Sequence, residues 1–206
     1  MTQPMSILTK IAWNFSPKMR DHAVQAVLIF TSVFLAFALN ECRMTSIEKR
    51  ETRKALAAIV HEMENNLDVL ERWAPYHKEV MDRTFQLLET DSAVLTQGRF
   101  SLEHLAGDSS SLMREFLTRH AWGYINAQNI NFDLQTRIDV IMVYQQQEFV
   151  EKSLGRLIEL LFSREMLEEN QTLENYVLFG QYMGDLWGQE HAMIDTYKFT
   201  LERLKE

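Results

Sequence analysis

One segment constrains the fold of this chain more than any other: the apolar run from Ala23 to Leu39, in which Gln25 is the single strongly polar residue. Its seventeen residues would rise about 25 Å as an α-helix. That length is close to the ~30 Å thickness of the hydrocarbon core of a bilayer. Charged and strongly polar residues close the run on both sides. The sequence therefore predicts one transmembrane helix over residues 17–41.

A cleaved signal peptide is the alternative, because Ala36-Phe37-Ala38 matches the small-x-small pattern of cleavage sites. Two features favour an uncleaved anchor instead. The apolar run is longer than a usual signal-peptide core. The segment before it, residues 1–16, places apolar and aromatic side chains on one helical face, as expected of a helix lying in the membrane interface.

The rest of the chain predicts long helices, because it contains few glycines and prolines to interrupt them. Apolar residues from Leu56 to Leu70 alternate spacings of four and three, the seam of a coiled coil. We expect the transmembrane helix to continue as a stalk over residues 42–74, or to kink near residues 40–42 and give two helices. Pro75 is expected to begin the next helix, with further helices over residues 112–128, 133–167 and 173–201. The fold class predicted is all-α: an N-terminal transmembrane helix continuing into an antiparallel helical bundle over residues 75–206.

The last predicted helix contains a ladder of Gly180, Gly184 and Gly188. Each glycine inside a helix costs nearly 1 kcal/mol relative to alanine, so three of them call for a reason. In lipid such a ladder favours helix dimerisation, but the polar residues between these glycines exclude a bilayer. We predict close packing inside the bundle beside Trp187, with a ligand groove as the alternative.

Charge is unevenly distributed along the chain, whose formal net charge is −8. Residues 1–56 carry eight Lys and Arg against four Asp and Glu, which leaves −12 for the rest. A basic collar around the anchor suits anionic lipid head groups. The acidic remainder argues against nucleic-acid binding.

Several short motifs carry a resemblance to a known family. They are the run from Leu35 to Glu41 followed by a helix rich in Arg and Lys, then Pro75-Tyr76-His77, Ala121-Trp122 and Tyr144-Gln145-Gln146-Gln147. In this order they resemble a family of bacterial single-pass membrane proteins with a helical domain of unknown function. Cys42 stands where the family pattern has tryptophan. The resemblance implies this architecture and a bacterial inner membrane, and it supplies no catalytic residue.

The sequence shows no motif that carries catalysis. It has no Glu-x-x-His, no glycine-rich phosphate loop and no G-x-S-x-G, and Cys42 is its lone cysteine. His61 with Glu64, and His191 with Asp195, share helix faces and could bind one metal ion if those helices met. Solvated or hydrogen-bonded histidines are the simpler interpretation. We therefore expect no enzyme, no catalytic residue, no metal and no cofactor.

Two other groups of residues are candidates for binding. Amphipathic side chains at Tyr76, His77, Trp122 and Tyr144 could line a small polar pocket, or they could fill the ends of the core with their polar tips in water. The alternative function that follows is a membrane-anchored sensory domain binding a small polar ligand.

Within the apolar run, Gln25, Ser32, Ala36 and Asn40 recur at spacings of seven, four and four, which places them on one helical face. Polar and small residues on one face of a membrane helix usually meet another helix. We expect self-association or contact with another membrane protein. The leading hypothesis is a non-enzymatic, oligomeric, membrane-anchored interaction or accessory protein.

Orientation in the membrane is nearly balanced by charge. Counting Lys and Arg alone would place the C-terminal side in the cytoplasm, because five follow the apolar run: Arg43, Lys49, Arg50, Arg53 and Lys54. Translocating the N-terminus would carry Lys10, Lys18 and Arg20 across the bilayer. A long C-terminal domain can be exported largely regardless of its charge. We predict a cytoplasmic N-terminus and periplasmic residues 43–206.

Overall fold

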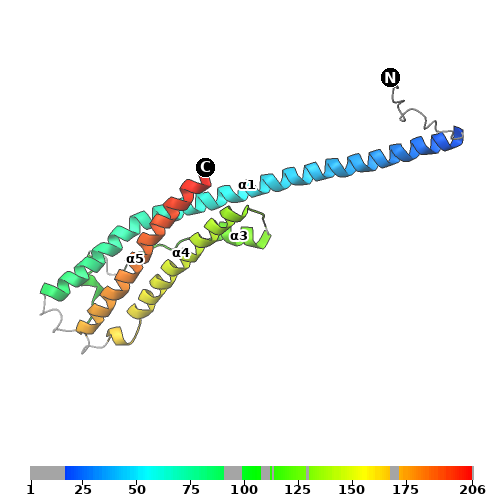
Figure 1. The fold of residues 1–206 in the computed structure, drawn as a ribbon. Helices are drawn as coiled ribbons and strands as arrows, with labels where there is room; N and C mark the ends of the chain where they lie inside the picture. Colours follow the sequence, from blue (N-terminus) through cyan, green and yellow to red (C-terminus); the bar gives the residue numbers. More distant parts are fainter. Residues whose placement is uncertain are drawn as a thin grey trace, which may run out of the picture. The chain divides into compact units, whose positions relative to one another are not determined.

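The structure is a computed structural model that describes residues 17–90, 99–107, 112, 114–128, 130–167 and 172–205. Every regular element among these residues is helical (Figure 1). The elements are α1 (Pro17–Thr90), η2 (Leu102–His104), α3 (His120–Gln128), α4 (Leu134–Leu161), η3 (Glu165–Leu167) and α5 (Thr172–Lys205). The predicted all-α class is confirmed. The predicted interfacial segment, residues 1–16, lies outside the described residues.

The chain divides into two compact units, an N-terminal unit of Met1–Arg50 and a C-terminal unit of Glu51–Glu206. The described part of the N-terminal unit belongs entirely to α1. The most apolar window of this helix has a mean hydropathy of 2.0, and none of that window is buried. By length and composition, α1 is therefore able to cross a membrane.

The C-terminal unit is a helical bundle in which α5 runs antiparallel to both α1 and α4. Four side-chain pairs set this arrangement: Glu64–Lys205 and Glu71–Lys198 between α1 and α5, and Asp139–Arg203 and Ser153–Asp185 between α4 and α5. It follows that the bundle part of α1 runs in the same direction as α4. The described parts of the connection between them are residues 99–107, 112, 114–128 and 130–133.

The core of the bundle includes residues that the sequence assigned to a stalk. Ala55, Ile59, Met63 and Leu70 are all buried, and they belong to the C-terminal unit. Since α1 buries one face from its first turns in that unit, residues 51–74 are a wall of the bundle. The heptad seam read in the sequence overlaps this face: Met63 and Leu70 are buried, whereas Leu56, Val60 and Leu67 lie at its edge and are partly buried.

Helix α1 also continues through Pro75, where the sequence predicted that a new helix begins. An interior proline lacks one backbone hydrogen bond and costs about 3 kcal/mol. The helix persists because Leu70 and Ala74 before the proline, and His77 and Val80 after it, are buried on the same side. Tertiary packing on both sides outweighs the local cost at the exposed proline.

The connection between α1 and α4 contains less helix than predicted. Residues 114–119 are not helical, and α3 begins only at His120. A short 3-10 helix, η2, lies earlier in the connection, and Ser101 caps it by accepting a hydrogen bond from the Glu103 N–H at 3.2 Å. Helix α4 ends at Leu161, six residues earlier than predicted.

Candidate functional site

The predicted membrane-helix face lies on the exposed part of α1. The side chains of Gln25, Ser32, Ala36 and Asn40 are all exposed in the single chain. The Ser32 hydroxyl donates a hydrogen bond to the Leu28 carbonyl at 2.7 Å, so this hydroxyl is satisfied within its own helix. No hydrogen bond joins the side-chain amides of Gln25 and Asn40 to another described residue. These two amides remain available to a neighbouring helix.

The three glycines of α5 have different surroundings. A Cβ atom at Gly180 would lie 3.2 Å from a ring carbon of Phe85 and 3.3 Å from the Thr84 methyl group, tighter than ordinary contact. A Cβ at Gly184 would lie at ordinary contact distance, 3.5 Å, from the Met81 sulfur.

At Gly188 a Cβ would meet nothing within 4 Å. Each step of four residues rotates a position about 40° around the helix, so Gly188 has turned about 80° away from the surface that Gly180 presents to α1. The close packing predicted for the whole ladder is therefore wrong for Gly188. Neighbouring Trp187 is half-buried and stacks on His191, with ring centroids 5.8 Å apart.

The four residues predicted to line one pocket form two separate groups. The rings of Trp122 and Tyr144 stack with centroids 5.4 Å apart. The ring of Tyr76 lies 5.5 Å from that of His77, which is buried and faces α5. Tyr144 bonds to Glu62, fifteen residues before His77 in α1, so the two groups are roughly 22 Å apart along the helix. The prediction of a single pocket from these residues is wrong.

The His77 group is a buried connection between α1 and α5. Its Nδ1 atom lies 2.8 and 2.9 Å from the two carboxylate oxygens of Glu190. Both side chains are almost fully enclosed. A buried carboxylate is stable in a protein interior only when it is hydrogen-bonded, so each partner depends on the other.

The second group centres on the buried carboxylate of Glu62, which joins three elements. One oxygen accepts a hydrogen bond from the Tyr144 hydroxyl of α4 at 2.6 Å, and the other accepts from the Ala121 N–H at 3.0 Å. Ala121 lies in the first turn of α3, where N–H groups lack helical partners and favour a negative charge. Burial, and then the Glu62 carboxylate, raise the pKa of Tyr144 far above its ordinary value.

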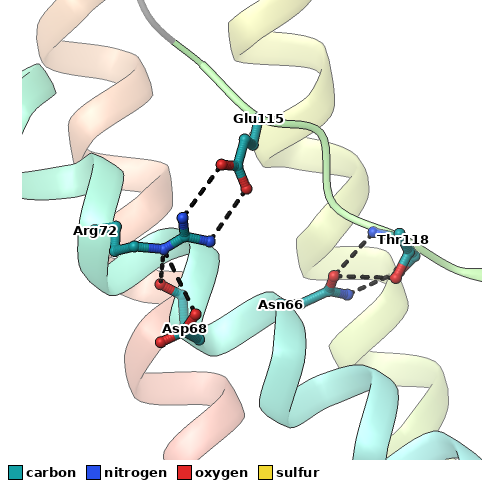
Figure 2. Close-up of polar contacts among 5 residues, drawn as sticks. All are labelled: Asn66, Asp68, Arg72, Glu115 and Thr118. Carbon is teal, nitrogen blue, oxygen red and sulfur yellow. Dashed lines mark hydrogen bonds and ion pairs between the residues drawn. The ribbon is translucent and has the colours of Figure 1, made fainter.

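One turn further along α1, Asn66 binds the backbone of the non-helical segment 114–119 (Figure 2). Its Nδ2 donates to the Thr118 carbonyl at 2.7 Å, and its Oδ1 accepts from the Thr118 N–H at 2.9 Å. The side-chain amide thus pairs with both the N–H and the carbonyl of one residue, as a neighbouring β-strand would. Nearer the surface, the guanidinium of Arg72 makes a forked contact of 3.3 and 3.2 Å with the Glu115 carboxylate. Both side chains hold the segment against α1.

Further hydrogen bonds extend this cluster into α4 and α5. Asn66 Nδ2 also donates to the Tyr197 hydroxyl at 3.1 Å, and that hydroxyl donates to Gln147 Oε1 at 3.1 Å. Gln147 in turn donates to the Thr118 carbonyl and to Glu151. Burial raises the pKa of Tyr197 above its ordinary value. We call Glu62, Asn66, Tyr144, Gln147 and Tyr197 the buried polar cluster; the exposed Thr118 joins it through its backbone.

A groove of about 360 Å³ lies between α1 and α3 in the C-terminal unit. Small side chains form its floor, Ala55 and Ala58 from α1 and Ala121 from α3, and charged side chains line it at Glu51 and Lys54. None of the four residues predicted to line a pocket borders this groove. Among the described residues, no three histidines, cysteines or acidic residues lie together as a metal site would require.

Together these features define a helical-bundle protein that carries one helix able to span a membrane. Comparison with models of known protein families, with curated proteins and with solved structures found no match to this chain. The functional argument therefore rests on its own side chains.

Proposed function

We propose that this chain is a non-enzymatic, membrane-anchored interaction subunit that assembles with other copies of itself through its N-terminal helix. One observation carries the proposal: an apolar run with exposed side chains, such as Phe30 at 73% and Phe37 at 70%, that also bears polar groups on one face. An exposed surface as apolar as this part of α1 is stable only when lipid or other helices cover it. A bilayer can cover the apolar part, and it leaves the amides of Gln25 and Asn40 unsatisfied.

A second helix supplies what lipid cannot. Side-chain amides hydrogen-bond across helix pairs in membranes, and small residues such as Ser32 and Ala36 let two backbones approach closely. Because the same face on a second copy offers the same groups, a symmetric pair satisfies both amides at once. Another membrane protein with a comparable face would compete for this surface.

Replacing Ser32 and Ala36 together by leucine tests the assembly. Larger side chains hold the backbones apart, so we expect fewer cross-linked oligomers in native membranes. The helix offers a matched control, Thr31→Leu with Ala38→Leu, which makes a similar exchange on the opposite face and should leave the cross-linking pattern unchanged. Monomer alone from the unaltered chain, or equal oligomer from both double variants, would refute assembly through this face.

The location that we propose is a bacterial inner membrane, with the N-terminus in the cytoplasm and the C-terminal unit in the periplasm. Lys10, Lys18 and Arg20 before the apolar run support this orientation, and the family resemblance supports the compartment. Alkaline phosphatase fused after Glu206 should be active, because that reporter folds only where disulfides form. A fusion that is inactive, alongside an active cytoplasmic reporter at the same site, would reverse the orientation.

A further inference from the structure

The groove between α1 and α3 has the size and lining of a small-molecule site. Its volume of about 360 Å³ falls within the ~300–1,000 Å³ of ordinary ligand pockets. Alanines at positions 55, 58 and 121 form its floor, beside the buried Ile125. Larger side chains at these positions would fill the space. The ring of Tyr124, 63% exposed, forms one wall.

Two opposite charges line the same groove without forming an ion pair with each other. Glu51 and Lys54 are three residues apart on α1, which puts their Cβ atoms roughly 5–6 Å apart on one face. No ion pair or hydrogen bond joins either side chain to another residue in the part of the chain that the structure describes. By contrast, Lys198 and Lys205 on α5 each pair with a carboxylate of α1 at 2.7 Å. The groove thus offers one free ammonium and one free carboxylate beside an apolar floor.

We propose that this groove binds a small zwitterion. The ligand's carboxylate or phosphate group pairs with the Lys54 ammonium, and its own ammonium pairs with the Glu51 carboxylate. A short apolar part of the ligand covers Ala58, and its cationic end gains from the face of the Tyr124 ring. A ligand with one charge would satisfy only one of the two groups and would bring a like charge near the other.

Two sources supply this chemistry: a free amino acid-like solute and a zwitterionic lipid head group. The site does not require the proposed assembly, since every residue that lines it belongs to one C-terminal unit. Binding and cross-linking can therefore fail independently.

Calorimetric titration of the full chain in dodecyl maltoside, an uncharged detergent, tests the proposal. The free probe is L-leucine, and its matched analogues are 4-methylpentanoate, which lacks the ammonium, and isoamylamine, which lacks the carboxylate. We expect leucine to bind at least about tenfold more tightly than either analogue, as the loss of one hydrogen bond to a charged group implies. The lipid probe is dihexanoyl phosphatidylethanolamine, compared with dihexanoyl phosphatidylglycerol.

Matched variants assign any binding to the groove. Lys54→Gln and Glu51→Gln should each weaken binding of the zwitterion at least about tenfold. Ala58→Leu should abolish binding by filling the floor, whereas Ala57→Leu changes the neighbouring exposed alanine, which does not line the groove, and should leave binding unchanged.

The free probe and the lipid probe distinguish the two possible sources of the ligand. Binding of leucine alone indicates a free solute, and binding of phosphatidylethanolamine alone indicates a lipid head group; binding of both supports the shared chemistry. The proposal is overturned if neither zwitterion binds at millimolar concentration, if a singly charged analogue binds as tightly, or if Ala58→Leu binds like Ala57→Leu.

Discussion

Asn66→Ala is the substitution whose effect follows most directly from the structure. Asn66 is 2% exposed, and its amide makes hydrogen bonds to the backbone N–H and carbonyl of Thr118 and to the Tyr197 hydroxyl. Alanine removes all of them and leaves the Thr118 N–H without its partner. The Thr118 carbonyl and the Tyr197 hydroxyl keep their bonds to Gln147. The Thr118 hydroxyl also loses the hydrogen bond that it donates to Asn66 Oδ1 at 3.2 Å, but Thr118 is exposed and its hydroxyl can turn to water. The loss is therefore concentrated on the backbone N–H.

The size of the effect can be estimated from these contacts. A partly buried donor left without a partner costs about 1–3 kcal/mol, and each further hydrogen bond contributes about 0.5–1.5 kcal/mol net. We expect Asn66→Ala to lower the free energy of unfolding by about 2–4 kcal/mol. Arg72→Ala is the matched control on the same segment: its ion pair with Glu115 is half-exposed, and exposed pairs contribute at most about 1 kcal/mol.

Urea unfolding of the full chain in non-ionic micelles would measure the difference, and amide hydrogen exchange would localise it. The Thr118 N–H should lose protection in Asn66→Ala and keep most of it in Arg72→Ala. If Asn66→Ala costs less than about 0.5 kcal/mol, or if the two variants are equally destabilised, segment 114–119 is not held by the buried amide and this reasoning fails.

Three further predictions concern the bundle. Gly180→Ala should destabilise it by about 1–3 kcal/mol through overpacking, whereas Gly188→Ala, in open space, should stabilise it by roughly 0.5–1 kcal/mol; equal melting shifts would contradict the packing. Glu190→Ala removes a buried carboxylate that contacts His77 at 2.8 Å and should lower the free energy of unfolding by about 1.5–3 kcal/mol, the range for a hydrogen bond to a charged group; an unchanged urea midpoint would show that the pair contributes nothing. Burial and a neighbouring carboxylate raise the pKa of Tyr144 above its ordinary 10.0, so above pH 10 this phenol ionises in the unfolded chain and stays protonated in the folded one. Stability should then fall by about 1.4 kcal/mol per pH unit for this group, and Tyr144→Phe should remove that part of the slope in unfolding titrations from pH 9 to 11.

The helices that the sequence predicted best are those with patterns contained in the helix itself. The apolar run from Ala23 to Leu39 and the seam from Leu56 to Leu70 depend only on residue type and spacing, and α1 contains both. A local rule gave the wrong boundary at Pro75, because the helix there is maintained by contacts with α5, more than a hundred residues away in sequence. One such contact is His77 with Glu190.

Segment 114–119 was also predicted from a local pattern, and the predicted helix was wrong. Leu112, Phe116 and Leu117 have helical spacing, yet Phe116 is 66% exposed in the structure. Within the segment, the backbone N–H and carbonyl of Thr118 bond to Asn66 instead, 52 residues earlier in the chain. No local pattern records a partner at that distance.

The buried polar cluster was missed although part of its signal was present. Asn66 follows Met63 by three residues and precedes Leu70 by four, so it lies on the apolar face of α1. A polar residue in that position implies a buried partner, but its identity depends on which elements pack opposite. Tyr144 was recognised as a candidate binding residue, whereas its partner Glu62 was not, because a glutamate in a charged helix is typical of a solvated surface.

The positions of the polar residues on α1 also fix how this helix sits in the bundle. Glu62 bonds to α3 and α4, Asn66 to segment 114–119 and α5, and His77 to α5. A slide of α1 by one turn would move each side chain about 5.4 Å, beyond the reach of any hydrogen bond. All three would then be buried without partners at once, whereas an apolar face can exchange neighbours at lower cost. Because the three contacts lie on different elements and share one helix, they resist axial displacement of the bundle part of α1 together.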